Sequence, residues 1–297
     1  MAVVSTGFFD GVHIGHRLVI DALVSEARRR GEESVVVSFW PHPRNVLQDE
    51  ARNLRLLSSL EEKKLMLKEL GVDRVEILPF TKEFASKTAE EYVRDVLIGR
   101  FDASAAVFGY DNRIGSDHKT FSALVPLSSS LGMDIIPCKE LGSISSTLIR
   151  KTLREGRVSD AADMLGYRYG LHGVVVSGNR LGRTIGFPTA NMQLYEPLKL
   201  IPAVGVYAVE VETLGGKYLG MSNIGVRPTV GLGNALTVET NIFDFDEDIY
   251  GLDITIRFIR RVREEKRFPS LTELKAQLSE DKRLILEGTS SEELSKQ

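Results

Sequence analysis

The spacing of apolar residues changes near the middle of this 297-residue chain, and the change divides the chain into two kinds of fold. In the first half, short apolar runs alternate with longer segments of helical periodicity. We expect strands at 2–6, 35–39, 74–78, 105–108 and 134–137, and helices at 16–30, 59–70 and 88–100. Because buried strands that alternate with helices form parallel sheets covered on both faces, the first half is predicted to be an α/β domain.

The second half contains strands with few helices between them. We expect strands at 206–213, 236–245 and 252–258, and a hairpin turn at Gly215 and Gly216. Short strands joined by glycine-rich turns favour a small antiparallel β-barrel. Residues 270–287 are predicted to close the chain as a helix, with Ser270 as its N-cap and Glu273 three residues later.

The length of the chain is sufficient for two domains, because a single hydrophobic core seldom grows beyond roughly 250–300 residues. The polar stretch 154–160 separates the two patterns. We therefore place the domains at 1–157 and 165–290.

Charge and cysteine content narrow the classes of partner. The formal net charge is −3, so no overall basic field recruits nucleic acid. The single cysteine, Cys138, cannot form a disulfide within the chain, which is typical of the reducing cytoplasm. No apolar run approaches the roughly 18 residues of a membrane span, and no secretory-signal pattern is present. We expect a cytoplasmic protein without nucleic-acid or membrane partners; the sequence indicates no oligomeric state.

The string GFFDGVHIGH, residues 7–16, lies where the first strand gives way to the first helix. A helix N-terminus offers unpaired N–H groups and a positive dipole, so it attracts phosphate. His13 and His16 add donors that follow charge as it moves to a leaving pyrophosphate. Gly7, Asp10 and Gly15 are assigned to the same phosphate site. Two surface histidines or a metal-binding pair would be the alternative if the two histidines stood alone.

Two further segments support this site. Ser146 and Thr147 precede a helical pattern and offer hydroxyl and N–H groups, while Arg150 adds a charge one turn later; an ordinary N-cap is the alternative. His42 lies in the loop FWPHP after a strand, where a simple strand terminator is the alternative. Asp111, after the strand at 105–108, is a weaker candidate for contact with a ribose or base.

A second candidate site lies in the glycine- and arginine-rich stretch 178–191. Glycines let backbone N–H groups approach a phosphate, and arginines supply positive charge. The predicted phosphate cradle comprises Gly178, Arg180, Gly182, Arg183 and Gly186. Thr189 and Asn191 then offer two neutral oxygens where Mg²⁺ would bind.

Phosphoryl transfer to an alcohol also needs a group that orients or deprotonates the hydroxyl, and no carboxylate lies within this stretch. Glu239 is the candidate. It belongs to a strand in which Glu239 and Asn241 share one face and Val238 and Thr240 the other. The alternative is a solvated strand glutamate.

Taken together, these strings resemble one family. FFDGVHIGH, FWPHP, FGYD and SSTLIR resemble the adenylyltransferase module of the bifunctional riboflavin kinase/FAD synthetase family. PTAN at 188–191, NIGVRPT at 223–229, VETNIFDFDEDIYG at 238–251 and REEKRF at 263–268 match its flavokinase module in order. No Walker loop is present, so a P-loop kinase is disfavoured.

The resemblance implies a Rossmann-like nucleotidylyltransferase domain followed by a small barrel, with ATP as co-substrate and Mg²⁺ as cofactor. Riboflavin is phosphorylated to FMN, and FMN then attacks the α-phosphorus of ATP to give FAD and pyrophosphate. Thr189 and Asn191 would bind Mg²⁺, Glu239 would act as base toward the ribityl hydroxyl, and Asn223 is a weaker flavin contact. His13, His16, Ser146, Thr147 and Arg150 would hold the triphosphate.

Two alternatives remain at this stage. Phe8 and the stretch 112–115 depart from the family pattern, so the adenylyltransferase module could be impaired while the flavokinase is active. A flavin-binding protein without turnover is the second alternative.

Overall fold

The computed structural model describes residues 1–47, 54–109, 113–138, 144–178, 181–229 and 233–289. The chain forms two compact units, Met1–Ser146 and Thr147–Gln297, and each is described here by itself. The predicted domain ranges, 1–157 and 165–290, stay predictions. Within the described residues, no helix combines the length and apolar character that a membrane crossing requires.

The first unit is built on a five-stranded sheet in the order β3-β2-β1-β4-β5, and every described pairing in it is parallel. Its strands are β1 (Ala2–Thr6), β2 (Glu33–Trp40), β3 (Arg74–Pro79), β4 (Ala103–Gly109) and β5 (Asp134–Cys138). Its helices are α1 (Ile14–Arg30), α2 (Pro43–Leu47), α3 (Leu60–Glu69), α4 (Lys82–Ala85), α5 (Ala89–Glu91), a π-helix (Tyr92–Ile98), α6 (Gly99–Phe101) and α7 (Phe121–Ser130). The predicted α/β class is confirmed.

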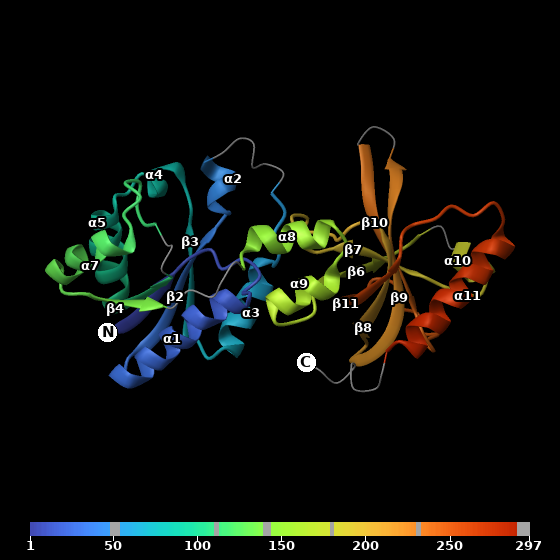
Figure 1. Cartoon of the computed structure of the whole chain (residues 1–297), viewed down its shortest axis with the longest axis horizontal. Helices are drawn as coiled ribbons and strands as arrows, with labels where there is room; N and C mark the ends of the chain where they lie inside the picture. The colour runs from blue at the N-terminus through green and yellow to red at the C-terminus, as the bar shows by residue number, and fades with distance from the viewer. Residues whose placement is uncertain (48–53, 110–112, 139–143, 179–180, 230–232, 290–297) are drawn as a thin grey trace. The chain divides into compact units, whose positions relative to one another are not determined.

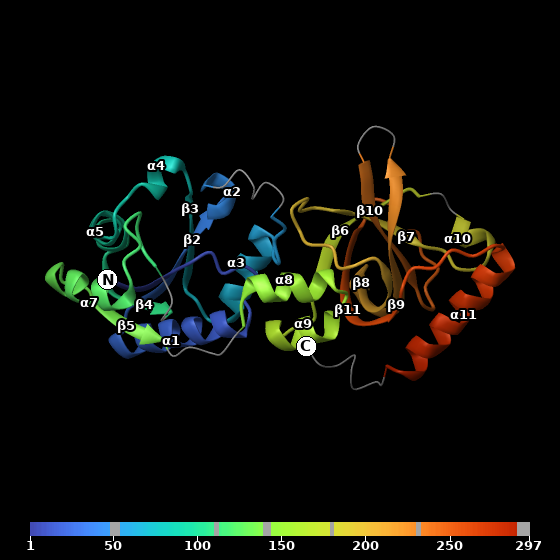
Figure 2. The ribbon, with the colours of Figure 1, turned by 45° about the horizontal axis from the view of Figure 1, so that its top comes forward.

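Helices cover both faces of this sheet because its strands are apolar on both faces. Val3 and Val36 pack with α1 and α3 on one face, whereas Val4 and Val37 pack with the π-helix and α7 on the other. Figures 1 and 2 show α1 and α3 along one side of the strands and α5 and α7 along the other. The predicted helix at 88–100 is a composite of α5, the π-helix and α6, and α7 was not predicted.

β1 lies at the point where the strand order reverses: β2 and β3 are added on one side of it, and β4 and β5 on the other. β1 pairs with β2 on one side and with β4 on the other. In open α/β sheets, ligands bind outside the carboxyl ends of the strands at such a reversal. The loop from Gly7 to His13 leaves β1 at this point.

The second unit is a closed barrel of six antiparallel strands in the order β10-β7-β6-β11-β8-β9. Its strands are β6 (Gly170–Val176), β7 (Ala190–Leu194), β8 (Gly205–Thr213), β9 (Gly216–Thr229), β10 (Gly233–Ile242) and β11 (Asp253–Arg263). Its helices are α8 (Ser146–Arg154), which begins one residue before the unit, α9 (Val158–Leu165), α10 (Leu181–Thr184) and α11 (Leu271–Glu287). The predicted barrel is confirmed, although β6, β7 and β9 were not predicted one by one.

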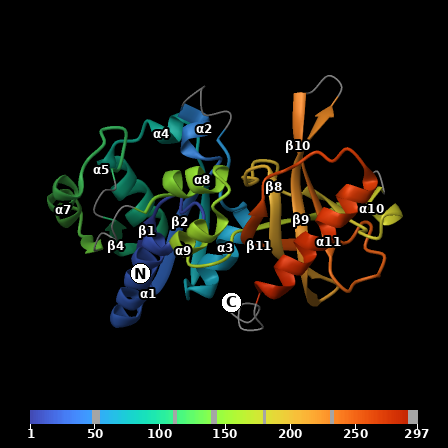
Figure 3. The same ribbon diagram turned by 45° about the vertical axis from the view of Figure 1, so that its right-hand side comes forward.

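Alternation along the strands divides the barrel wall into an inner and an outer face. Tyr207 and Phe258 are fully buried and their rings meet edge to face inside the barrel. Val206 and Met221 instead pack outward with Ile285 of α11, which lies beside β9 in Figure 3. The Ser270 hydroxyl accepts a hydrogen bond from the Glu273 N–H, as predicted, and so begins α11.

Candidate active sites

The N-terminus of α1 carries both histidines of the first site. His13 is the N-cap of the helix, and its Nδ1 accepts a hydrogen bond from the His16 N–H at 3.4 Å. The two imidazole rings are stacked with their centroids 3.6 Å apart. The spacing of three residues therefore brings both rings together at the end of the helix where phosphate is favoured.

His16 is held in its neutral form. Its pKa lies well below the ordinary value because burial disfavours the imidazolium, and the nearby His13 and Lys63 charges act in the same direction. Among the described residues, no side chain or backbone group forms a hydrogen bond with the His16 Nδ1. A neutral imidazole offers one donor and one acceptor, which suits a group that contacts a phosphate oxygen.

Asp10 fixes the loop that precedes the helix. Its carboxylate accepts hydrogen bonds from the Leu57 N–H at 3.0 Å and the Ser58 N–H at 3.2 Å. Its backbone carbonyl accepts a hydrogen bond from the Ser146 hydroxyl at 3.1 Å. The predicted phosphate-site residues Asp10 and Ser146 are thus brought together, and the Asp10 side chain is engaged with backbone N–H groups.

The same loop contains two non-glycine residues in the left-handed region, Phe9 with φ 52° and Val12 with φ 37°. Such conformations are unfavourable for residues with a β-carbon and persist only where the surroundings impose them. A β-carbon at Gly7 would lie 3.1 Å from the Phe9 ring, and one at Gly15 would lie 3.3 Å from the His13 ring. The loop is therefore closely packed around both glycines.

A cavity of about 520 Å³ opens beside this loop. Its walls include Thr6 and Gly7 at the end of β1 and the aromatic rings of Phe39, Phe80 and Phe84, which contact one another edge to face or at a tilt. The lining is completed by Pro43, Leu47, Ala85, Lys87, Tyr92, Arg113, Ile114, Gly115, Ser116 and His118. A cavity lined mainly by aromatic and aliphatic side chains, with a few polar groups, suits a largely apolar ring system.

The sequence did not identify these aromatic residues, because they come from segments that are far apart along the chain. His42, which was predicted as a weak contact, packs its ring against Phe8 with centroids 4.1 Å apart. Its Nδ1 accepts a hydrogen bond from the Arg44 N–H. His42 is therefore a neighbour of the phosphate loop rather than part of the cavity lining.

The remaining predicted residues of this site lie elsewhere. Thr147 is exposed and Arg150 is buried, both on α8 and both within the second unit. Their grouping with His13 and His16 stays a prediction. Asp111 lies outside the described residues.

In the second unit, the strand register brings three predicted residues into one row. Glu239 on β10 is paired with Asn191 on β7 and, on its other side, with Asn223 on β9. Residues directly opposite each other in antiparallel strands project from the same face of the sheet, with β-carbons about 5 Å apart. The row thus places a carboxylate between two amides on the outer face of the barrel.

The segment that carries Thr189 is fixed to β10. The Asn241 side-chain amide donates a hydrogen bond to the Pro188 carbonyl at 2.6 Å. A β-carbon at Gly178 would lie closer than van der Waals contact to the Asn191 amide, and one at Gly182 would meet the Phe187 carbonyl. Both glycines are therefore required for the chain to pass this closely.

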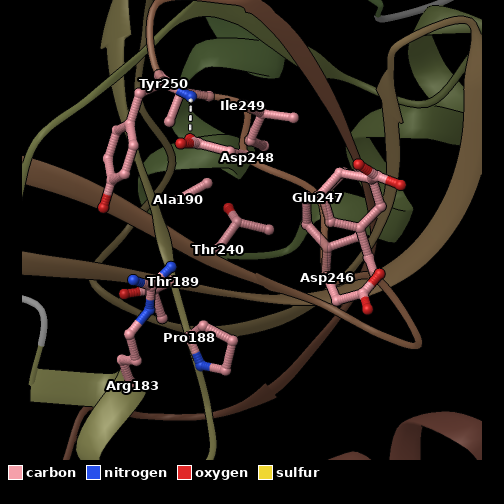
Figure 4. A pocket seen from close by; sticks show the side chains of 13 residues that line it. Arg183, Pro188, Thr189, Ala190, Thr240, Asp246, Glu247, Asp248, Ile249 and Tyr250 are labelled. Atoms are coloured by element: carbon pink, nitrogen blue, oxygen red, sulfur yellow. Dashed lines mark hydrogen bonds between the residues drawn. The ribbon is translucent and has the colours of Figure 1, made fainter.

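Gly186 adopts a left-handed φ of 84° after α10, which an L-residue rarely adopts. Arg183 on α10 lies beside Thr189 in the lining of a cavity (Figure 4). Arg180 lies outside the described residues. Gly178 lies against the Asn191 amide, whereas Gly182 and Arg183 belong to α10 and line different cavities, so their grouping as one cradle stays a prediction.

Two cavities lie on opposite faces of β10. Glu239 and Asn241 line an outer cavity of about 220 Å³, whereas Thr240 and Ile242 line an inner cavity of about 270 Å³. Thr189 lines both. The alternation of β10 thus gives each cavity its own side chains, and Thr189 marks the point where the two approach each other.

The outer cavity has apolar walls. These are Ile185, Phe187, Val206, Met221, Phe268, Leu274 and Leu278, and Gly182, Asn223, Arg263, Glu265 and Lys266 add polar groups. Arg263 is held in place by a buried carboxylate on α11, Asp281, with nitrogen–oxygen distances of 2.8–3.0 Å. The sequence identified Arg263 only as part of a motif, and the partner Asp281 lies on another element.

The inner cavity is more polar. The segment Asp246–Tyr250 lies across from Thr189 and Thr240, and the backbone N–H of Tyr250 donates to the Asp248 carboxylate (Figure 4). Arg183 supplies a positive charge on the other side. The cavity thus joins one cation and two threonine hydroxyls with the carboxylates of Asp246, Glu247 and Asp248, and its cationic side is the one suited to a phosphate.

Comparison with known proteins agrees with this arrangement. Residues 1–152 match the FAD synthetase family and residues 165–287 match the riboflavin kinase family. A bifunctional riboflavin kinase/FMN adenylyltransferase of Bacillus subtilis is 35% identical over 287 residues, which are 95% of this chain and 90% of that protein. Its Escherichia coli counterpart is 39% identical over 285 residues, 94% of this chain and 90% of that protein.

A solved structure from Streptococcus pneumoniae is similar over both units. It is described as a macrolide-efflux protein, is 36% identical, and covers 96% of this chain and 93% of its own with a TM-score of 0.89.

Proposed function

This chain belongs to the family of bifunctional riboflavin kinases/FMN adenylyltransferases, and we propose how its two activities are distributed over its residues. The chain phosphorylates riboflavin to FMN with ATP and then adenylylates FMN to FAD. We assign the adenylyltransferase to residues 1–157 and the kinase to residues 165–290. An impaired adenylyltransferase or a non-catalytic flavin binder is not favoured, because both family matches are present and the relatives carry both activities.

The observation that carries the kinase assignment is the pairing of Asn191 with Glu239 beside Thr189, where the two cavities approach each other. Riboflavin would occupy the outer cavity, whose apolar walls suit the isoalloxazine ring. ATP would occupy the inner cavity, with Arg183 near its phosphates. The acceptor hydroxyl and the γ-phosphate would then meet beside Thr189.

In this arrangement, Glu239 accepts the proton of the terminal ribityl hydroxyl as the oxygen forms a bond to the γ-phosphorus and the bond to ADP breaks. Positioning by the two cavities removes most of the entropic barrier to bringing the reactants together. Asn223, in the same row as Glu239, would contact the flavin chain.

The residues around Asn191 fit a Mg²⁺ ion. Thr189 and Asn191 supply neutral oxygens, and Gly178 leaves the Asn191 amide the room that a β-carbon would fill. These are the ligand types that Mg²⁺ prefers, together with substrate phosphates. When bound, Mg²⁺ would neutralise charge on the transferring phosphoryl group.

For adenylyl transfer, the FMN ring would occupy the aromatic cavity beside Gly7, and the ATP triphosphate would lie at the N-terminus of α1. The FMN phosphate attacks the α-phosphorus, and pyrophosphate leaves. His13 and His16 would contact the charge that develops on the pyrophosphate. Gly15 allows the close approach, and Ser146, Thr147 and Arg150 would complete the phosphate site.

The partners that this proposal requires are riboflavin, FMN and ATP, without nucleic acid or membrane. A cytoplasmic location is proposed from the single cysteine and the availability of ATP.

The assignment is tested by incubating the pure protein with riboflavin and MgATP and separating the flavins by chromatography at timed intervals. FMN should appear first and FAD should follow. Absence of both products would overturn the proposed function, and a reaction that stops at FMN would support the kinase alone. Phe84→Ala should raise the KM for FMN in the adenylyl transfer while leaving the KM for riboflavin in the kinase reaction unchanged.

A further inference from the structure

Lys63 on α3 is buried, with only 1% of its surface exposed. Lysine is almost never fully buried unless its charge has a partner. Its ammonium lies 3.6 Å from the centroid of the Phe8 ring and donates a hydrogen bond to the Ser38 hydroxyl at 3.3 Å. The nearest neighbour along the helix, Lys64, instead pairs with Glu61 at the surface. Lys63 is therefore directed inward, toward the loop between β1 and α1.

The neighbours of the Lys63 ammonium among the described residues help to hold that loop. The Ser38 hydroxyl that accepts from Lys63 itself donates to the Phe8 carbonyl at 3.2 Å. Lys63 and Ser38 thus hold both the ring and the carbonyl of Phe8. Asp10, two residues later, is attracted to Lys63 and accepts hydrogen bonds from the segment just before α3.

The charge of Lys63 also acts at the histidine pair. It is one of the groups that lower the pKa of His16, so its field is felt at the N-terminus of α1. Burial lowers the pKa of Lys63 itself to about 8, while Asp10 opposes that shift. At neutral pH the site therefore contains a cation beneath the loop and a neutral imidazole in the first turn of α1.

We propose that Lys63 is a positioning residue for adenylyl transfer: it clamps the Phe8–Asp10 loop and places a fixed positive charge beneath the site of the ATP triphosphate. The inference rests on the proposed function of the first unit. The chemical group that this charge serves is a polyphosphate, because a buried cation beside a helix N-terminus adds to the dipole that already favours anions. Lys63 does not contact the substrate and acts through the loop and through its field.

The first test compares Lys63→Met with Lys64→Met, a neutral substitution at the next position of the same helix. Methionine retains most of the buried stem without the charge. Loss of one buried charge beneath the proposed triphosphate site predicts a rise of roughly tenfold in the KM for ATP in FAD formation. Lys64→Met should change this value less than twofold. The kinase activity of the same chain is an internal control and should stay unchanged in both variants.

A pH profile separates the field of Lys63 from a merely structural role. Among the described residues, Asp10 and His16 are the other charged or titratable groups that interact with Lys63. As the pH rises through about 8, Lys63 loses its proton, so kcat/KM for ATP in FAD formation should fall in the wild type. Lys63→Met should lack this fall, and Lys63→Arg should retain ATP affinity at pH 9.

The outcomes are distinct. A Lys63→Met variant with wild-type KM and an unchanged alkaline fall would overturn the inference. The inference would also be overturned if kcat and KM both decreased by the same factor, the melting temperature fell, and the pH profile of FAD formation did not change. If Lys63→Met does not fold, the pH profile of Lys63→Arg serves as the test. If kcat/KM for ATP in this variant falls at alkaline pH as it does in the wild type, the proposed role of Lys63 is overturned. Failure of the wild type to form FAD would instead overturn the proposed function.

Discussion

Asn191 on β7 lies directly opposite Glu239 on β10 in the antiparallel ladder of the barrel. The two residues are 48 positions apart in the chain, yet their side chains project from the same face with β-carbons about 5 Å apart. A metal-ligand candidate and a candidate base therefore lie side by side on two paired strands, and neither belongs to a loop. Strands hold such a pair more rigidly than loops do, which suits a reaction that depends on alignment.

Glu239→Gln should lower kcat for FMN formation by about 10²–10⁴-fold, because the amide cannot accept the hydroxyl proton. Its shape is retained, so the KM for ATP should change little. The measurement is the rate of FMN formation under saturating ATP, alongside the adenylylation of supplied FMN, which should continue. Glu212→Gln, a half-exposed strand glutamate paired with Arg257, is the matched control and should leave both rates unchanged. A fully active Glu239→Gln variant would exclude Glu239 as the base.

Gly178→Ala should disturb the metal site, because the new β-carbon would overlap the Asn191 amide. We expect a lower melting temperature and a higher KM for MgATP in the kinase reaction. In the double variant with Asn191→Ala, the overlapping amide is gone, so Gly178→Ala should then cost little additional stability. Purely additive effects on the melting temperature would show that the two residues do not meet as the structure places them.

The faces of the strands were accessible from the sequence because alternation is a local property. Glu239 and Asn241 were predicted to share one face, and they line the outer cavity while Thr240 lines the inner one. The α/β pattern of the first half was equally local, because each short apolar run indicates a buried strand without reference to the rest of the chain. These predictions needed no knowledge of which elements pair.

Other features of the two sites could be identified only from the tertiary structure. The register that joins Asn191 to Glu239 depends on the pairing of strands that are not consecutive in the chain. Lys63 belongs to a charged helix, and its burial depends on its contacts with Phe8 and with Ser38 of β2. The aromatic cavity likewise draws its residues from separate loops, so no spacing in the sequence marks it.

Replacing both His13 and His16 by alanine should abolish FAD formation, with a loss of at least about 100-fold, while FMN accumulates. The two rings are stacked at the N-terminus of α1, so removing both takes away the side chains proposed to contact the departing pyrophosphate. Chromatography of the flavins after reaction with riboflavin and MgATP measures both steps at once. Loss of FMN as well as FAD would argue against two independent sites.

The protonation state of His16 predicts how the stability of the first unit varies with pH. Its folded-state pKa lies below the unfolded value, so the unfolded chain binds the proton first as the pH falls. Stability is therefore fully present above about pH 6.5 and decreases below it, by at most about 1.4 kcal/mol per pH unit from this group. Thermal unfolding at pH 7.5 and 5.5 measures the difference. His16→Gln should reduce it, and an unchanged difference would contradict the assignment of a neutral, buried imidazole.

Asp281→Asn tests the ion pair that positions the wall of the outer cavity. Asp281 is fully buried on α11 and holds Arg263 of β11 through both carboxylate oxygens, while Gln277 donates to the same carboxylate. Removing the charge leaves Arg263, whose side chain is 20% exposed, without this counter-ion. Breaking a buried pair in this way costs about 3–5 kcal/mol of unfolding free energy.

Denaturant unfolding measures that cost, and the KM for riboflavin should rise because Arg263 lines the cavity proposed for the flavin. The matched control is Asp244→Asn, which removes the exposed partner of Lys282, the residue that follows Asp281 on the same helix. An exposed pair of this kind contributes at most about 1 kcal/mol. Equal losses of unfolding free energy in the two variants would mean that burial does not make the Asp281–Arg263 pair stronger than the exposed pair. An unchanged KM for riboflavin in Asp281→Asn would show that Arg263 does not contribute to flavin binding.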